Sequence, residues 1–101
     1  MRQGIIDSVV YHQQYIVVID MYIGELDPHI VGEVIAKFRR KKGISQEVMS
    51  GLAGIGRTHL SAIERGERKP TLETLYKLSC ALGVNMSDIV LEIEKMLPED
   101  S

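Results

Sequence analysis

Hydrophobic residues recur every three or four positions over most of the chain after residue 26, and this spacing predicts α-helices. Asp27 and Pro28 are a typical N-cap and first helical residue, so we expect the first helix to begin there and to end at Gly43. Ser45 predicts the start of a second helix, which ends near Ala53. The apolar face of the first helix consists of Ile30, Val31, Val34, Ile35 and Phe38.

Three further helices follow from the same spacing. The third runs from Gly56 to about Arg65, with Gly66 as the glycine that ends it. The fourth starts at Pro70-Thr71 and stops at Gly83, and the fifth is capped by Ser87-Asp88 and ends at Pro98. The inner face of the fourth helix is predicted to carry Leu72, Leu75, Leu78 and Leu82. The apolar stripe of the fifth consists of Ile89, Val90, Ile93, Met96 and Leu97. We therefore predict a compact all-α bundle of five helices over residues 27–97, followed by a short tail over 98–101.

The first 26 residues do not fit the helical pattern. The segments 5–10 and 15–23 are rich in β-branched residues and tyrosine, around a polar break at 12–14, which favours strands. We expect residues 1–26 to form an extended or β-hairpin arm that packs on its own bundle or pairs with a partner subunit, because so apolar a surface invites association. Alternatively, translation starts at Met21 and residues 1–20 do not belong to the natural protein.

Composition limits the classes of function. The chain has 45% hydrophobic and 26% charged residues, a net charge of −2 and one cysteine, Cys80. No apolar run is long enough to span a bilayer and no secretory leader opens the chain, so we expect a cytoplasmic protein without a membrane partner. The three histidines lie on separate elements without metal-ligand spacing, which predicts no metal site. The sequence contains no catalytic constellation and no nucleotide-binding loop, so we predict neither an enzyme nor a cofactor.

The distribution of charge is more informative than its sum. Residues 37–69 hold nine Lys or Arg against three acids, a net charge of +6, while the rest of the chain carries −8. A basic segment of this kind is expected where a protein binds phosphates. The basic run 39–42 also suits the C-terminus of a helix, where the dipole favours positive charge, and both roles are compatible.

Residues 45–70 contain the features of two short helices joined by a tight turn. Ser50 is small where the helices would cross, Gly54 can take the positive φ that the turn needs, and Ile55 is apolar directly after it. We expect a wedge of core between the helices made of Met49, Leu52, Leu60 and Ile63. This unit is the one that places a helix in the major groove of DNA.

With these features in order, the chain resembles the lambda-repressor-like helix-turn-helix proteins, also called the Cro/CI or Xre family. The resemblance covers about residues 30–93 and includes Glu64-Arg65-Gly66, Lys69-Pro70, the segment 71–75 and the segment 81–84. It implies a five-helix DNA-binding domain whose third helix reads DNA. It also implies that Arg39 pairs with Glu64 to tie this helix to the first one. The N-terminal arm departs from the family pattern.

The residue types on the third helix and around it predict the contacts with double-stranded DNA. Arg57 is the best candidate for a base contact, because its guanidinium can pair with guanine O6 and N7. The full set of predicted base contacts is Arg57, Thr58, Ser61 and Ala62. Gln46 opens the second helix, where its amide and the free N–H groups can bind phosphate. The full set of predicted phosphate contacts is Gln46, Arg40, Lys42, Arg65, Arg68 and Lys69.

We interpret the chain as a sequence-specific transcriptional regulator, a repressor that binds a palindromic operator as a homodimer. The stripe of the fifth helix (Ile89, Val90, Ile93, Met96 and Leu97) is the predicted dimer interface, unless Ile89 and Ile93 only close the core of the bundle. Two alternatives remain open. The protein could be the antitoxin of a toxin–antitoxin operon, with a protein partner, or an interaction module that has kept the fold but not DNA binding.

Overall fold

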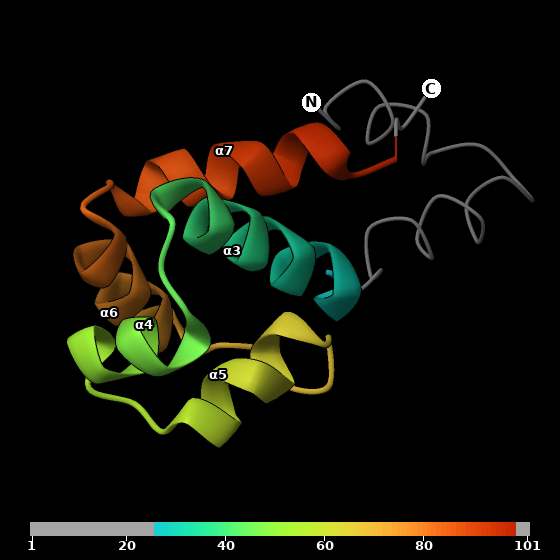
Figure 1. Cartoon of the computed structure of the whole chain (residues 1–101). Coiled ribbons are helices and arrows are strands. Elements are labelled where there is room, and N and C mark those ends of the chain that lie inside the picture. Colours follow the sequence, from blue (N-terminus) through green and yellow to red (C-terminus); the bar gives the residue numbers. More distant parts are fainter. Residues whose placement is uncertain (1–25, 99–101) are drawn as a thin grey trace, which may run out of the picture. The chain divides into compact units, whose positions relative to one another are not determined.

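A computed structural model describes residues 26–98, which contain five helices and no strand (Figure 1). The helices are α3 (Pro28–Lys42), α4 (Gln46–Ala53), α5 (Arg57–Glu64), α6 (Leu72–Leu82) and α7 (Met86–Met96). Residues Asp27–Leu97 form one compact unit. The predicted all-α bundle is therefore confirmed, whereas the predicted arm and the end of the predicted tail lie outside the described residues.

Side-chain caps set where α3, α4 and α6 begin, as the sequence predicts. Asp27 Oδ1 accepts a hydrogen bond of 2.9 Å from the backbone N–H of His29, and Ser45 Oγ accepts one of 3.1 Å from that of Val48. Thr71 Oγ1 does the same for Thr74 at the start of α6. These side chains satisfy N–H groups that the first turn of a helix leaves unpaired.

The start of α7 differs from the prediction. The helix begins at Met86, and its N-cap is Asn85 instead of the predicted Ser87-Asp88. Asp88 lies in the first turn, and its Oδ2 accepts a 2.9 Å hydrogen bond from the backbone N–H of Asn85. Asp88 therefore caps the helix by reaching backwards from inside it, which is the second half of a capping box.

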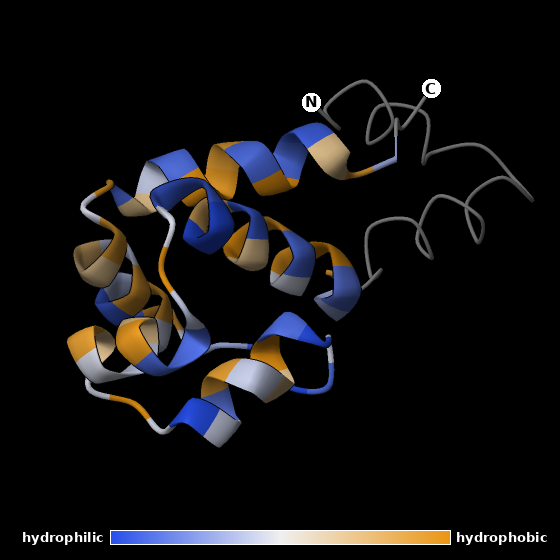
Figure 2. Ribbon diagram, viewed as in Figure 1, coloured by the Kyte–Doolittle hydropathy of each residue, from blue (hydrophilic) through white to orange (hydrophobic). Residues whose placement is uncertain are grey.

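The core lies where the apolar faces of all five helices meet. In Figure 2 each helix carries both hydrophobic and hydrophilic residues, as expected for amphipathic helices around one core. The largest side chains that are fully buried are Val34, Ile35, Met49, Leu60, Ile63, Leu78 and Ile89. Burying side chains of this size stabilises the fold by about 1.5–3 kcal/mol each.

Two predicted core residues are exposed. Leu52 was assigned to the wedge between the second and third helices, but the buried face of α4 consists of Met49, Ser50 and Ala53, and Leu52 lies beside that face. Leu72 is the first residue of α6 and lies before the buried part of the helix, which begins at Leu75. A spacing of three or four residues identifies a helix face, but it does not fix where the buried face ends.

The helix α3 is the scaffold on which the other helices are placed. It packs against α5 and α7, while α4 packs against α5 and α6. The contact between α3 and the end of α5 is so close that only a glycine fits. A Cβ atom on Gly32 would lie 2.7 Å from the backbone oxygen of Glu64 and closer still to that of Ile63. The C-terminal end of α5 therefore rests directly on the backbone of α3.

Candidate nucleic-acid interface

The helices α4 and α5 are joined by a turn of three residues, Gly54 to Gly56. Gly54 has a φ of 71°, a conformation that glycine adopts without strain. The backbone N–H of Ile55 donates to the carbonyl of Ser50 over 3.0 Å, and the partly buried Ile55 side chain packs against the core. The turn predicted from the sequence is confirmed, and it fixes the direction in which α5 leaves α4.

The outward face of α5 contains the residues predicted to contact bases. Arg57 and Thr58 in its first turn are exposed, and Ser61 and Ala62 in the next turn are half-buried. Leu60 and Ile63 lie on the opposite side of the helix and are fully buried. This short helix thus presents a strip of polar or small side chains, on a backbone that the core holds in place.

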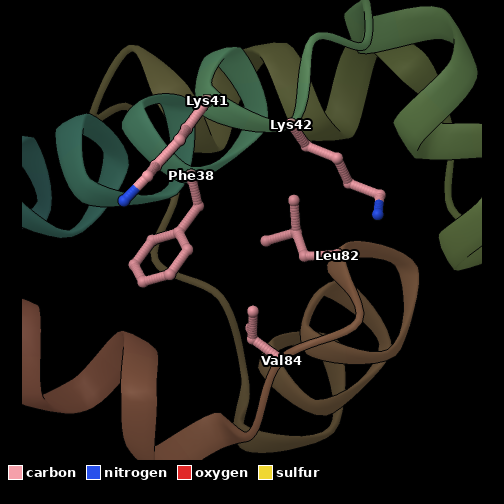
Figure 3. A pocket seen from close by; sticks show the side chains of 5 residues that line it. All are labelled: Phe38, Lys41, Lys42, Leu82 and Val84. Atoms are coloured by element: carbon pink, nitrogen blue, oxygen red, sulfur yellow. The ribbon is translucent and has the colours of Figure 1, made fainter.

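The basic residues at the end of α3 do not form one surface. Lys37 Nζ lies 3.7 Å from Glu92 Oε1 on α7. Lys41 and Lys42 line a pocket of about 210 Å³ together with Phe38, Leu82 and Val84 (Figure 3). Arg40 and Lys42, two of the predicted phosphate contacts, are both exposed. Among these residues Lys37 is paired with α7, while Lys41 and Lys42 border the pocket and are exposed.

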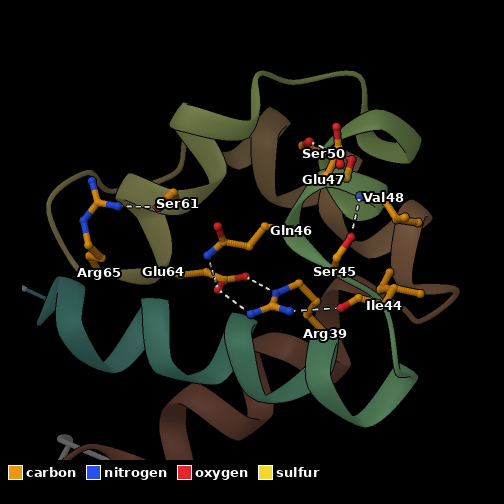
Figure 4. Close-up of polar contacts among 10 residues, drawn as sticks. All are labelled: Arg39, Ile44, Ser45, Gln46, Glu47, Val48, Ser50, Ser61, Glu64 and Arg65. Carbon is orange, nitrogen blue, oxygen red and sulfur yellow. Dashed lines mark hydrogen bonds and ion pairs between the residues drawn. The ribbon is translucent and has the colours of Figure 1, made fainter.

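The carboxylate of Glu64 is the centre of a hydrogen-bond network that joins three helices (Figure 4). Arg39 Nε donates to Glu64 Oε2 over 2.7 Å and Arg39 Nη2 donates to Glu64 Oε1 over 3.0 Å. Arg39 Nη1 also donates to the carbonyl oxygen of Ile44 over 3.0 Å. The hydrogen bonds to Glu64 are the main cause of a raised pKa of Arg39. The ion pair implied by the family resemblance is therefore present, and it connects the last residue of α5 to α3.

Gln46 belongs to the same network, which the sequence did not predict. Its Nε2 donates to Glu64 Oε1 over 2.9 Å, so the side chain is held against the end of α5. The amide oxygen of Gln46 and the backbone N–H groups of the first turn of α4 do not take part in this bond. Gln46 is the first residue of α4 and Glu64 the last of α5, and only the packing of the two helices brings them together.

The basic residues after α5 have different environments. Arg65 donates from Nε and Nη2 to the two carboxylate oxygens of Glu67, at 2.9 Å each, and from Nη1 to Ser61 Oγ. The hydrogen bonds between Arg65 and Glu67 are the main cause of a raised pKa of Arg65 and a lowered pKa of Glu67. Arg68 and Lys69 are exposed in the segment that leads to α6. Sequence reasoning assigned Arg65 to phosphate and did not identify Glu67 as its partner.

The predicted dimer stripe on α7 is divided between core and surface. Ile89 and Ile93 are buried in the core of their own chain, so they offer no exposed surface to a second subunit. Val90 and Met96 are exposed, and Leu97 is half-buried. Leu91, which the predicted stripe left out, is exposed as well. The exposed apolar residues of α7 are therefore Val90, Leu91 and Met96, and the half-buried Leu97 follows directly after the helix.

Within residues 26–98 there is no cluster of three or more His, Cys, Asp or Glu side chains that could hold a metal ion. None of the described helices is long and apolar enough to cross a membrane. Cys80 is exposed on α6.

Comparison with known proteins gives one consistent result. The Helix-turn-helix family matches residues 35–89. An uncharacterized HTH-type transcriptional regulator, y4dJ of Sinorhizobium fredii, is 44% identical over 61 residues, which cover 60% of this chain and 79% of that protein. Control protein C.MunI of a Mycoplasma species is 37% identical over 65 residues, covering 63% of this chain and 88% of that protein.

A solved structure agrees with these sequences. The restriction-modification controller protein C.AhdI from Aeromonas hydrophila matches with a TM-score of 0.62 and 31% identity, over 64% of this chain and 98% of that one. The family match over residues 35–89 covers more than half of the chain. It includes α4, α5, the turn between them and most of the bundle. The chain belongs to the helix-turn-helix family of lambda-repressor-like, DNA-binding transcription regulators, which is not a family of enzymes.

Proposed function

We propose that this protein is a sequence-specific transcriptional repressor that binds a palindromic operator as a homodimer. The observation that carries the proposal is the arrangement of α5. Its outward strip of Arg57, Thr58, Ser61 and Ala62 is polar or small, while its end is fixed to α3 and α4 by the Glu64 network. A recognition helix must be held rigidly to discriminate bases, because readout depends on hydrogen bonds with narrow geometry.

In this proposal Arg57 pairs with the O6 and N7 atoms of a guanine, and Thr58 and Ala62 contact the methyl groups of thymines. Gln46 binds a backbone phosphate through its amide and the N-terminus of α4, and its hydrogen bond to Glu64 sets the position of that contact. Arg40, Lys42, Arg68 and Lys69 supply further phosphate contacts. The similarity to control protein C.MunI and to the controller C.AhdI supports a role in the control of transcription.

Selection of bound sequences from random duplex DNA tests this reading. We expect the wild type to enrich a palindrome with half-sites about one helical turn apart. Arg57→Ala should relax the preference at one position in each half-site. Arg68→Ala, the matched control, should weaken binding to every sequence and lower the slope of log K against log salt by about one unit. Equal, weak binding of the wild type to all duplexes would contradict sequence-specific readout and favour an interaction module.

Homodimers through α7 need a separate test, because the exposed apolar surface there is small. We propose that Val90 and Leu91 form the centre of the interface, with Met96 and Leu97 at one end. Leu91→Glu should shift the protein from dimer to monomer in sedimentation equilibrium and should weaken operator binding. Leu52→Glu places the same charge at an exposed leucine of α4 and should leave the dimer intact. A dimer that survives Leu91→Glu would place the interface elsewhere.

A further inference from the structure

Three side chains around the C-terminal end of α5, those of Ser61, Arg65 and Glu67, form a hydrogen-bond network. The proposed function does not explain its geometry. The guanidinium of Arg65 is bound side-on by the carboxylate of Glu67, with both nitrogen–oxygen distances at 2.9 Å. On its other side, Nη1 donates to the hydroxyl oxygen of Ser61, and Figure 4 shows Arg65 reaching toward Ser61. The guanidinium is thus fixed on two sides by groups of its own chain.

The network lies on the strip that we propose to face DNA. Arg57, Ser61 and Arg65 are four residues apart, and residues at this spacing lie on one face of a helix. The helical path continues through Arg65, whose φ and ψ are −82° and −3° and whose backbone N–H donates to the carbonyl of Ser61. The contact with Ser61 therefore keeps the Arg65 guanidinium beside the base-facing strip.

The donors that remain on Arg65 match a specific ligand. A guanidinium has five N–H donors. Glu67 takes the one on Nε and one on Nη2, and Ser61 takes one on Nη1. One N–H on Nη1 and one on Nη2 remain, and these two form the end-on fork that fits O6 and N7 of guanine. Ser61 accepts from Arg65, so its own hydroxyl hydrogen stays available as a donor.

Pairing with Glu67 also changes what Arg65 can do electrostatically. The two side chains together carry no net charge, so the pair attracts the phosphate backbone much less than a lone arginine would. A phosphate contact needs charge and tolerates a mobile side chain, whereas a base contact needs a fixed fork. The arrangement suits the second role.

We propose that Arg65 is a second base-reading arginine that recognises a guanine, and that Glu67 is a specificity-determining residue that positions it. This inference rests on the proposed function, since it assumes that α5 enters the major groove. It replaces the phosphate contact expected for Arg65. It also gives a role to Glu67, one of the three acids in the basic segment 37–69.

The test measures the preference at each operator position and the salt dependence for wild type, Arg65→Ala, Arg65→Lys and Glu67→Gln. We expect the wild type to select a guanine in each half-site at a position that Arg57→Ala does not affect. Arg65→Ala should reduce this preference by about 5- to 150-fold, the range for a bidentate arginine–guanine pair, and should leave the preference at the other positions unchanged. Arg65→Lys should lose the preference too, because an ammonium keeps the charge but lacks the planar fork.

Glu67→Gln separates positioning from simple charge. Removing an acid near DNA should raise the affinity for every duplex if charge alone matters. Positioning by Glu67 requires instead that the guanine preference falls, by about 2- to 10-fold, because an unheld arginine must be ordered on binding. The salt slope should rise toward one more unit as Arg65 becomes available to phosphate. Glu73→Gln, which breaks an exposed pair with Lys77 on α6, is the matched control and should change neither quantity.

Other outcomes overturn the inference. If Arg65→Ala weakens binding to all sequences equally and lowers the salt slope by about one unit, Arg65 is a phosphate contact. If the wild type selects a palindrome whose half-sites lack the second guanine, this inference fails while the proposed function stands. If the wild type selects no sequence, both fail.

Discussion

Two arginine–glutamate pairs lie at the C-terminal end of α5. Arg39 and Glu64 are 14% and 6% exposed, whereas Arg65 and Glu67 are 52% and 60% exposed. Both pairs are bidentate, with nitrogen–oxygen distances between 2.7 and 3.0 Å. The same two side chains in nearly the same geometry thus occur in a mostly buried and in a solvated environment.

The difference in burial gives the two pairs different roles. Breaking a buried pair leaves a charge without water or a partner, and this is costly. An exposed pair contributes little, because water replaces the lost partner. Arg39–Glu64 is therefore suited to hold α5 on α3. Arg65–Glu67 adds little stability and is suited to the role that we propose for it, to orient the Arg65 side chain.

The largest expected effect is on stability, and it appears when the acid of each pair is removed in turn and the two variants are compared. Glu64→Ala should lower the free energy of unfolding by about 3–5 kcal/mol, because it strands the Arg39 guanidinium and also removes the acceptor of Gln46. Glu67→Ala should lower it far less, because water replaces the lost partner of an exposed pair. Urea unfolding followed by circular dichroism measures both. Similar losses of unfolding free energy in the two variants would show that solvent reaches the Arg39–Glu64 pair. The two pairs would then not differ in their contribution to stability.

The close contact between α3 and α5 provides a second test of how α5 is held on α3. In Gly32→Ala the new methyl group would meet the backbone of Ile63 and Glu64, which cannot move without shifting α5. We expect a loss of about 1–3 kcal/mol, although alanine is the better helix former. Gly51→Ala on α4 is the matched control, since no atom lies within 4 Å of its added Cβ.

The control should change stability in the opposite direction. Gly51→Ala should stabilise the protein by about 0.5–1 kcal/mol, because alanine loses less conformational entropy in a helix than glycine does. The same unfolding experiment compares the two variants. If Gly32→Ala were as stabilising as Gly51→Ala, the close approach of α3 and α5 would not exist.

Local features of the sequence were enough to predict the helices and the turn. Capping by Asp27, Ser45 and Thr71 depends on residues two or three positions away, and the positive φ of Gly54 depends on the residue itself. Such interactions can be read from neighbouring residues. The errors at Leu52 and Leu72 occur where tertiary packing decides how far the buried face extends. The cap of α7 is different, because the interaction between Asn85 and Asp88 spans only three positions and is local.

The two networks at the end of α5 show the same limit for the candidate site. The Arg39–Glu64 pair was implied by a family resemblance, not by the spacing of the residues, and the bond between Gln46 and Glu64 spans 18 positions. Arg65 and Glu67 are only two apart, a spacing that does not bring side chains together within a helix. They meet because Gly66, with a φ of 78°, turns the chain back, so that the N–H of Glu67 donates to the carbonyl of Ala62 over 2.9 Å.

The smallest expected effect concerns the protonation of Glu67, and it tests whether the outer pair forms in the free protein. Hydrogen bonds from Arg65, and secondly its positive charge, lower the pKa of Glu67. The folded state therefore favours the carboxylate. The small contribution of the pair to stability is complete above the ordinary glutamate pKa and is lost as the pH falls through the lowered value.

Carbon-detected NMR titration of the glutamate carboxyl groups measures this directly. In the wild type the midpoint for Glu67 should lie below the ordinary glutamate value, and in Arg65→Ala it should rise toward that value. Glu92, whose pKa is lowered mainly by Lys95, is the internal control and should titrate alike in both proteins. If the Glu67 midpoint were the same in the wild type and in Arg65→Ala, Arg65 would not be held by Glu67 in the free protein. Arg65 would then be a mobile arginine suited to a phosphate contact. The contrast between a buried pair that holds α5 and an exposed pair that orients Arg65 would no longer hold.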